Sequence, residues 1–169
     1  LPPLGIEALI SVVNQHAIPE VVFTGTTSDP QLYRFEGELL ELLRGRLHPR
    51  ARLSVHTNGA RTLDRLEVFN RYDRACLSIP SFCPDIYEAM MGSRKVPDLA
   101  AILAKTTVPV KVSAVVNEHN ASDIEAFVAE CRELGVRRCT RVELRDYRDL
   151  TGRYDRIASI EMCEAVGER

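Results

Sequence analysis

The chain has 169 residues, and its 22 Lys and Arg against 24 Asp and Glu give a formal net charge of −2. This balance argues against a general nucleic-acid binder, whose affinity comes from neutralised phosphates. Hydrophobic residues make up 45% of the chain and charged residues 27%, as in a globular domain that holds its own core. No apolar run approaches the roughly 20 residues of a membrane helix, and no basic region of a secretory signal precedes Ile6. We expect one cytoplasmic domain without a membrane partner.

In chain order, the sequence alternates helical patterns with short apolar runs. Apolar residues three or four apart predict helices, and runs rich in Val, Ile or Leu predict strands. Strands are predicted over Val21–Thr24, Leu53–Thr57, Ala75–Ile79, Val110–Val116 and Arg141–Leu144. Helices are predicted over Ile6–Val13, Leu32–Leu43, Leu63–Phe69, from Pro97 and Asp98 onward, over Ile124–Leu134 and over Arg156–Ala165. For the helix over Ile124–Leu134, Asn120 or Ser122 is the expected N-cap and Gly135 the expected end.

This alternation predicts parallel strands joined by right-handed helical crossovers. Because the series opens with a helix, a first strand is expected upstream of Leu1, and residues 1–169 are expected to form a single domain that is truncated at its N-terminus.

The five cysteines are odd in number and contain no C-x-x-C pair, which disfavours both a disulfide framework and a zinc site. They are predicted to be reduced thiols of an intracellular protein, with Cys131 serving as an apolar contact on a helix.

Polar and apolar residues alternate along several of the predicted strands. Ser54 and His56 alternate with Leu53 and Val55, and Lys111 alternates with its apolar neighbours in the same way. Successive side chains of a strand point to opposite faces, so helices would cover one face and leave the other polar. A curved sheet would turn that polar face into a wet cavity. The alternative is the solvated face of an open sheet.

Polar and Gly-containing stretches follow each predicted strand, as in 24–30 and 57–59. The carboxyl ends of parallel strands carry the active site in β/α folds, so these stretches predict a ligand site at that edge. Ordinary turn chemistry places the same residue types there, and that interpretation stays open for each loop taken alone.

The order and spacing of these segments resemble the radical S-adenosylmethionine superfamily, in particular its cofactor-maturing and peptide-modifying branch. The segments that carry the resemblance are 21–25, 53–59, 77–79, 86–92, 112–116, Asn120 and 133–136. The resemblance implies a partial (β/α)6 barrel, similar to a TIM barrel. It also implies S-adenosylmethionine and a 4Fe–4S iron–sulfur cluster as cofactors.

The resemblance also implies which residues meet S-adenosylmethionine. The stretch 25–30 matches the family's Gly-Gly-Glu-Pro loop, keeping its first Gly and its acid-Pro ending while changing the middle. The implied cofactor-binding residues are Gly25, Thr26, Thr27, Asp29, Thr57, Ser78, Ser113, Asn117 and Arg145. Each of these residues also has a purely structural interpretation: a plain turn for the two Gly-containing loops, a buried hydroxyl for Ser78 and a surface ion pair for Arg145.

Four further residues are weaker candidates for substrate contact or proton transfer: His56, Lys111, Glu143 and Cys83. Their structural alternatives are a hydrogen-bonded structural role for His56, an ion pair between Lys111 and Glu143, and loop packing for Cys83.

The family holds its cluster with a Cys-x3-Cys-x2-Cys loop after the first strand, and this chain has no cysteine before Cys76. The metal ligands are therefore expected upstream of Leu1, or the chain is a relative that has lost them. In the complete enzyme, reductive cleavage of S-adenosylmethionine would give a 5′-deoxyadenosyl radical that abstracts hydrogen from a small-molecule or peptide substrate. Flavodoxin or ferredoxin would supply the electron.

Two alternatives remain. One is a cluster-independent lyase or hydrolase that uses His56, or Lys111 as a Schiff-base residue in an apolar pocket. The other is a non-catalytic scaffold.

Overall fold

The computed structural model describes residues 5–25 and 28–136, and it describes the backbone of residues 139–143. Helices and strands alternate along the chain as the sequence predicts, except that two helices rather than one separate the third strand from the fourth. The elements are α1 (Ile6–Gln15), β1 (Glu20–Phe23), the short 3-10 helix η1 (Pro30–Leu32), α2 (Glu36–Arg46), β2 (Arg52–Thr57), α3 (Leu66–Phe69), β3 (Arg74–Ser78), α4 (Pro84–Met91), α5 (Leu99–Lys105), β4 (Val110–Val116), α6 (Ile124–Glu133) and β5 (Cys139–Glu143).

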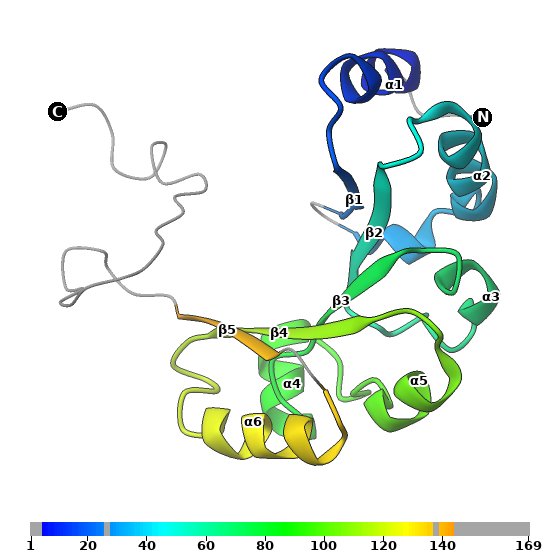
Figure 1. Ribbon diagram of the computed structural model, residues 1–169. Helices are drawn as coiled ribbons and strands as arrows, with labels where there is room; N and C mark the ends of the chain where they lie inside the picture. The colour runs from blue at the N-terminus through cyan, green and yellow to red at the C-terminus, as the bar shows by residue number, and fades with distance from the viewer. Residues whose placement is uncertain (1–4, 26–27, 137–138, 144–169) are drawn as a thin grey trace, which may run out of the picture.

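The five strands form one parallel sheet in the order β1-β2-β3-β4-β5. This sequential order differs from a doubly wound sheet, in which the strand order reverses at a switch point. The sheet curves strongly between β1 and β5 (Figure 1). In the part of the chain that the structure describes, the sheet stays open and no closed barrel forms. The predicted α/β class with parallel strands is confirmed.

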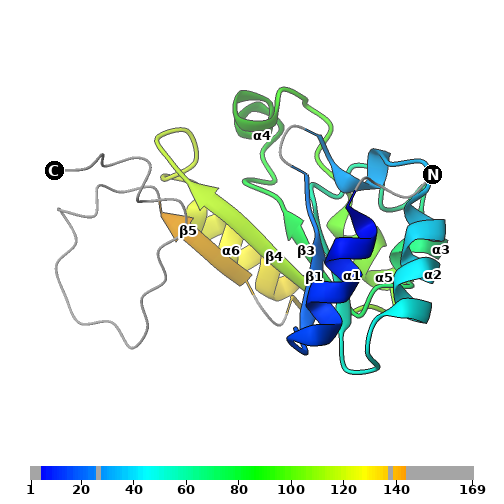
Figure 2. The same ribbon diagram turned by 90° about the horizontal axis from the view of Figure 1, so that it is seen from above.

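Helices α1, α2, α3, α5 and α6 pack on the outer, convex side of the sheet (Figures 1 and 2). The strand side chains on that side are apolar and buried, with Leu53, Val55, Leu77 and Val112 each no more than 1% exposed. They form one core with buried helix residues. These are Ile6 and Ile10 of α1, Leu40 and Leu43 of α2, Phe69 of α3, Leu99 and Ile102 of α5, and Ile124, Phe127 and Cys131 of α6. Burial of this apolar area is the main favourable contribution that holds the helices against the sheet.

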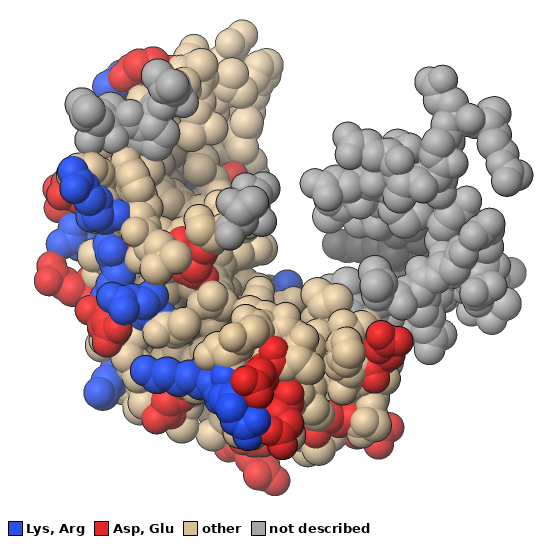
Figure 3. Space-filling model, turned by 180° about the vertical axis from the view of Figure 1, so that it is seen from behind, with Lys and Arg blue, Asp and Glu red and all other residues tan. Residues whose placement is uncertain are grey.

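The opposite face of the sheet is polar, as the alternation predicts. Strand register places His56, Cys76 and Lys111 side by side on β2, β3 and β4, and it places Ser78 opposite Ser113 one step further along. Seen from behind, the described body has a crescent outline around a hollow, and Lys or Arg side chains intermingle with Asp or Glu over the visible surface (Figure 3).

Several element boundaries test the predictions made from sequence. The Asp98 side chain caps α5 by accepting from the Ala101 N–H at 2.8 Å, and Gly135 follows α6 with a left-handed φ of 78°, so both expected signals are confirmed. The expected cap of α6 by Asn120 or Ser122 is wrong, because the helix is preceded by Asp123, which makes no side-chain cap hydrogen bond.

Asn120 is instead fully buried between two loops. Its amide donates to the carbonyls of Pro80 and Val115 at 2.9 and 3.0 Å, and so joins the chain after β3 to the end of β4. The predicted helix over Arg156–Ala165 lies outside the described residues.

Among the described residues, Cys76, Cys83 and Cys131 form no disulfide, and Cys131 is completely buried in the core, as predicted. Among the helices of the described part, none combines the length and apolar character needed to cross a bilayer.

Candidate functional site

A polar cavity of about 360 Å³ lies at the carboxyl ends of β1, β2 and β3. We call it the edge cavity. It brings together five of the residues predicted from sequence, which come from the loop after β1 and from strands β2 and β3. Its lining is Thr24, Gly25, Ser28, Asp29, Pro30, His56, Thr57, Asn58 and Ser78. The expectation that polar loops gather at this edge of the sheet is therefore met for β1, β2 and β3.

Asp29 fastens the loop after β1 to the end of β2. Its carboxylate accepts from the Gln31 N–H at 2.9 Å, from the Asn58 N–H at 2.7 Å and from the Thr57 hydroxyl at 2.8 Å. A carboxylate has about four lone-pair sites, so these three donors leave roughly one for a ligand. Asp29 thus both shapes the cavity and offers it a negative charge.

Below Asp29, a buried polar cluster supports the same loop. Gln31 and Thr62 are completely buried, and the Thr62 hydroxyl donates to Gln31 Oε1 at 2.8 Å. Thr57 Oγ1 lies 3.0 Å from the same oxygen and accepts from the Gly59 N–H at 3.1 Å. The Thr57 hydroxyl has a single proton to share between Asp29 and Gln31. Thr57 is only 2% exposed, so its main role is to hold Asp29 and Gln31 in place.

Gly25 is required by the tight path of the chain after β1. A Cβ atom at this position would overlap the backbone carbonyl of Ser28. No side chain fits there unless the loop changes shape, so Gly25 keeps backbone close to the cavity.

A second buried group lies behind the loop, at Glu36 on α2. Its side chain is completely buried; Oε1 accepts from the Tyr72 hydroxyl at 2.8 Å, and Oε2 lies 3.2 Å from the Arg65 guanidinium. Burial raises the pKa of Glu36, against the opposing effects of Tyr72 and Arg65. Burial and the neighbouring Glu36 raise the pKa of Tyr72 as well.

The polar face of the sheet holds a second cavity of about 440 Å³, which we call the inner cavity. It runs from the amino ends of β1 to β4 up to His56, which lines both cavities. Its other lining residues are Glu20, Ser54, Arg74, Ala75, Cys76, Pro109, Val110 and Lys111. Burial, followed by the charge of Lys111, lowers the pKa of His56, although Glu20 acts in the opposite direction.

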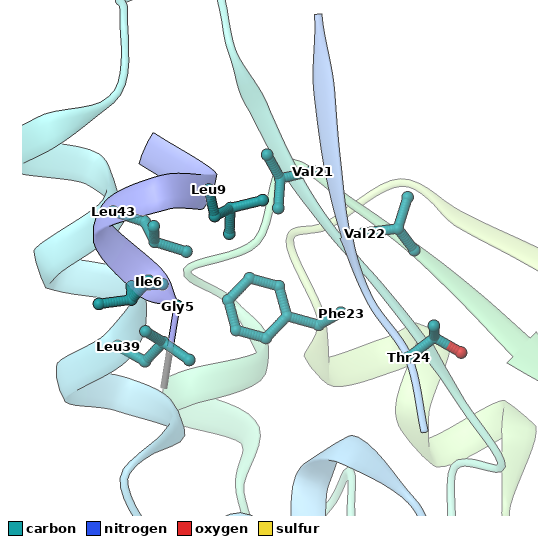
Figure 4. A pocket seen from close by; sticks show the side chains of 9 residues that line it. All are labelled: Gly5, Ile6, Leu9, Val21, Val22, Phe23, Thr24, Leu39 and Leu43. Atoms are coloured by element: carbon teal, nitrogen blue, oxygen red, sulfur yellow. The ribbon is translucent and has the colours of Figure 1, made fainter. Parts of the chain in front are cut away.

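A third recess, of about 230 Å³, is apolar and lies between α1, α2 and β1. Figure 4 shows the ring of Phe23 pointing from β1 toward Ile6 and Leu39, while Val22 and Thr24 point to the other side of the strand. The helix residues that line it carry no polar side chain, so the recess does not suit a polar ligand.

Three predicted site residues lie outside the linings of both the edge cavity and the inner cavity. Ser113 sits on β4 opposite Ser78. Asn117 stabilises its own turn by accepting from the His119 N–H at 2.9 Å. Cys83 precedes α4, where its N–H donates to Ser81 Oγ at 2.9 Å.

The structure does not describe the side chains of the remaining predicted site residues. Thr26, Thr27 and Arg145 fall outside the described residues. Glu143 ends β5, paired with Val116, and only its backbone is described, so its proposed contact with Lys111 stays untested.

Sequence reasoning missed several residues of the two cavities. Ser28 and Asn58 belong to loops that were singled out, and only their neighbours were chosen. Arg74 gave a detectable signal, because it stands two residues before Cys76 and so lies on the polar face. Gln31 gave none, since a glutamine is seldom buried.

Comparison with known proteins gives a family match and several structural neighbours. Residues 105–169, less than half of the chain, match the model of the family "Mycolic acid cyclopropane synthetase", which is of the S-adenosylmethionine-dependent methyltransferase type. No curated protein matches the chain in sequence.

Two solved structures share the fold. One is native anSMEcpe with bound AdoMet and the Kp18Cys peptide, at a TM-score of 0.65 and 19% identity over 92% of this chain. The other is native anSMEcpe with bound AdoMet, at a TM-score of 0.63 and 19% identity over 92% of this chain. The chain spans 46% of the length of each.

The family match corrects the expectation drawn from sequence. The assignment to the radical S-adenosylmethionine superfamily is wrong, because the matched family is of the methyltransferase type. The family match also contradicts the predictions that depended on that assignment. These are reductive cleavage, the 5′-deoxyadenosyl radical, the iron–sulfur cluster and the metal-binding character. The flavodoxin or ferredoxin reductant was inferred from it alone and loses its basis. Among residues 5–25 and 28–136, no group of three His, Cys, Asp or Glu is placed to hold a metal ion.

Proposed function

We propose that the chain binds S-adenosylmethionine in the edge cavity and is the cofactor-binding part of a methyltransferase-type enzyme. The observation that carries this proposal is the gathering of Gly25, Asp29 and Ser78 in one polar cavity at the carboxyl edge of parallel strands. The family match over 105–169 and the S-adenosylmethionine bound to the structural neighbours support the choice of ligand.

The residues of the edge cavity fit the amino-acid and ribose part of such a ligand. Its 360 Å³ falls within the usual size range of small-molecule sites, about 300–1,000 Å³. The remaining acceptor site of Asp29 suits an ammonium group, and the hydroxyls of Ser28 and Ser78 suit ribose or carboxylate oxygens. Thr57 positions Asp29 rather than touching the ligand.

When bound, S-adenosylmethionine supplies an electrophilic methyl group on a sulfonium centre. The chain's own residues hold the amino-acid end at Asp29 and keep backbone close at Gly25. His56 stands between the edge and inner cavities, with a pKa held below its ordinary value. A neutral imidazole at that place can accept a proton from a second substrate.

Residues 1–169 are proposed to form one domain, and the open sheet is proposed to be part of a six-stranded partial (β/α) barrel. The sequential strand order and the helices on one face support this arrangement. The cluster-independent lyase gains no support, because Lys111 lies among polar residues and not in the apolar pocket that a Schiff-base lysine needs.

Isothermal titration calorimetry with S-adenosylmethionine tests the proposal. We expect saturable binding to the wild-type chain and a loss of about tenfold in affinity for Ser78→Ala, since one hydrogen bond to a charged or polar ligand contributes roughly that much. Ser93→Ala, in the exposed loop after α4, is the matched control and should bind like wild type. Absence of binding to the wild-type chain, or equal losses in both variants, would overturn the proposal.

A further inference from the structure

The inner cavity carries an excess of positive charge on the polar face of the sheet. Arg74 stands at the start of β3 and Lys111 near the start of β4, and both line the cavity. Glu20 is the carboxylate of the lining, and one of its oxygens already accepts from the Ser54 hydroxyl at 2.8 Å. The lining therefore holds two cationic side chains and one carboxylate, and that carboxylate already has a hydrogen-bond partner.

Neither cation forms an ion pair with any residue that the structure describes. The register explains how the two cations meet. Lys111 lies opposite Cys76, and Arg74 is two residues before Cys76 on the same face. Strand geometry then puts their Cα atoms roughly 8 Å apart, a separation that one carboxylate or phosphate group can bridge with both side chains.

The inner cavity also meets the edge cavity. His56 lines both, so a ligand group in the inner cavity lies next to whatever occupies the edge cavity. This continuity is what a two-substrate site requires, because the reacting groups must approach within contact distance.

We propose that the inner cavity binds the anionic group, a carboxylate or a phosphate, of the second substrate, with Arg74 and Lys111 as its cationic partners. Describing the ligand as a second substrate rests on the proposed function, whereas the anion site itself does not. His56 faces the same space and, held neutral by burial and by Lys111, adds an N–H donor without adding charge. The reaction that consumes such a substrate would methylate an acidic small molecule.

Titration calorimetry with inorganic phosphate and, in a second arm, with succinate tests the site and separates its two chemical sources. We expect one saturable site for at least one anion, with affinity reduced about tenfold or more in Arg74→Gln and in Lys111→Met. Lys105→Met on α5 and Arg132→Gln on α6 remove equal charge from the outer surface and should bind like wild type.

Three results would overturn the proposal: no saturable binding of either anion, equal weakening in the outer-surface controls, or binding that survives in the Arg74→Gln, Lys111→Met double variant. S-adenosylmethionine affinity is measured on the same proteins. If S-adenosylmethionine binds and neither anion does, this inference fails and the proposed function stands. If an anion binds and S-adenosylmethionine does not, the proposed function fails and the anion site stands. A second readout is the imidazole NMR titration of His56 in the wild-type chain, whose pKa should rise when phosphate is present and stay fixed if the anion binds elsewhere.

Discussion

At the scale of single residues, Asp29 joins the chemistry of the edge cavity to its construction. One carboxylate accepts from two backbone N–H groups and a hydroxyl, so it holds the β1 loop against β2. Asp29 was predicted from the resemblance alone, because the acid-Pro ending of the stretch 25–30 matches the family's Gly-Gly-Glu-Pro loop. The sequence could not reveal that the Thr57 hydroxyl would contact both Asp29 and Gln31. These residues lie 28 and 26 positions away from Thr57 in the chain, so the contacts depend on the fold.

Asp29→Asn keeps the shape of the side chain and removes its charge. We expect it to lower the free energy of unfolding by about 1–3 kcal/mol, the usual effect of weakening hydrogen bonds to a charged group. Urea denaturation followed by circular dichroism measures this. Asp85→Asn, on the exposed surface of α4, should change stability far less; a similar effect of the two substitutions would contradict the bracing role.

Glu36 makes stability depend on pH in a defined direction. Its folded-state pKa is raised above the ordinary 4.5, so its contribution to stability is present in full below 4.5 and is lost as the pH rises through the raised value. Glu36→Gln removes this titration. The stability of wild type relative to Glu36→Gln should therefore fall between pH 4.5 and the raised pKa. Urea denaturation series at several pH values measure it, and a difference that is constant or grows with pH would refute the assignment.

The pKa of His56 responds to charges on two neighbouring strands. Lys111 lowers it and Glu20 raises it. Lys111→Met should therefore move the His56 pKa up toward 6.5, while Glu20→Gln should move it further down. NMR titration of the imidazole protons follows both variants. Shifts in the same direction would show that His56 does not lie between these two charges.

At the scale of elements, apolar periodicity located the strands to within about two residues, because burial on the convex face imposes it. Helix α4 was not predicted, although Pro84 at its first position is a recognised start signal. The wrong cap of α6 has a clear cause: Asn120 is needed between the ends of β3 and β4. Local sequence could not show that long-range use.

The loop after β1 gives a prediction at this scale. In Gly25→Ala the added methyl group would overlap the Ser28 carbonyl, so the loop must move and S-adenosylmethionine binding should weaken by at least about tenfold. Gly45→Ala is the matched control, because a Cβ at this position in α2 meets nothing within 4 Å. It should keep ligand affinity and gain about 0.5–1 kcal/mol of stability. Equal affinities of the two variants would contradict the role of Gly25.

At the scale of the whole molecule, one curved parallel sheet separates two environments. Its convex face builds the core with the helices, and its concave face and carboxyl edge carry the cavities (Figure 1). Alternation along the strands was sufficient to predict this division, because successive side chains must point to opposite faces. Composition and strand pattern did not separate one S-adenosylmethionine family from another, and the family match corrected that step.

A crystal structure of the chain with S-adenosylmethionine tests the central claim most directly. The account predicts the amino-acid end of the ligand beside Asp29 and the Gly25 backbone, with its reacting end directed toward His56. Density for the ligand in the apolar recess between α1 and β1, or at the amino ends of the strands with the edge cavity empty, would contradict it.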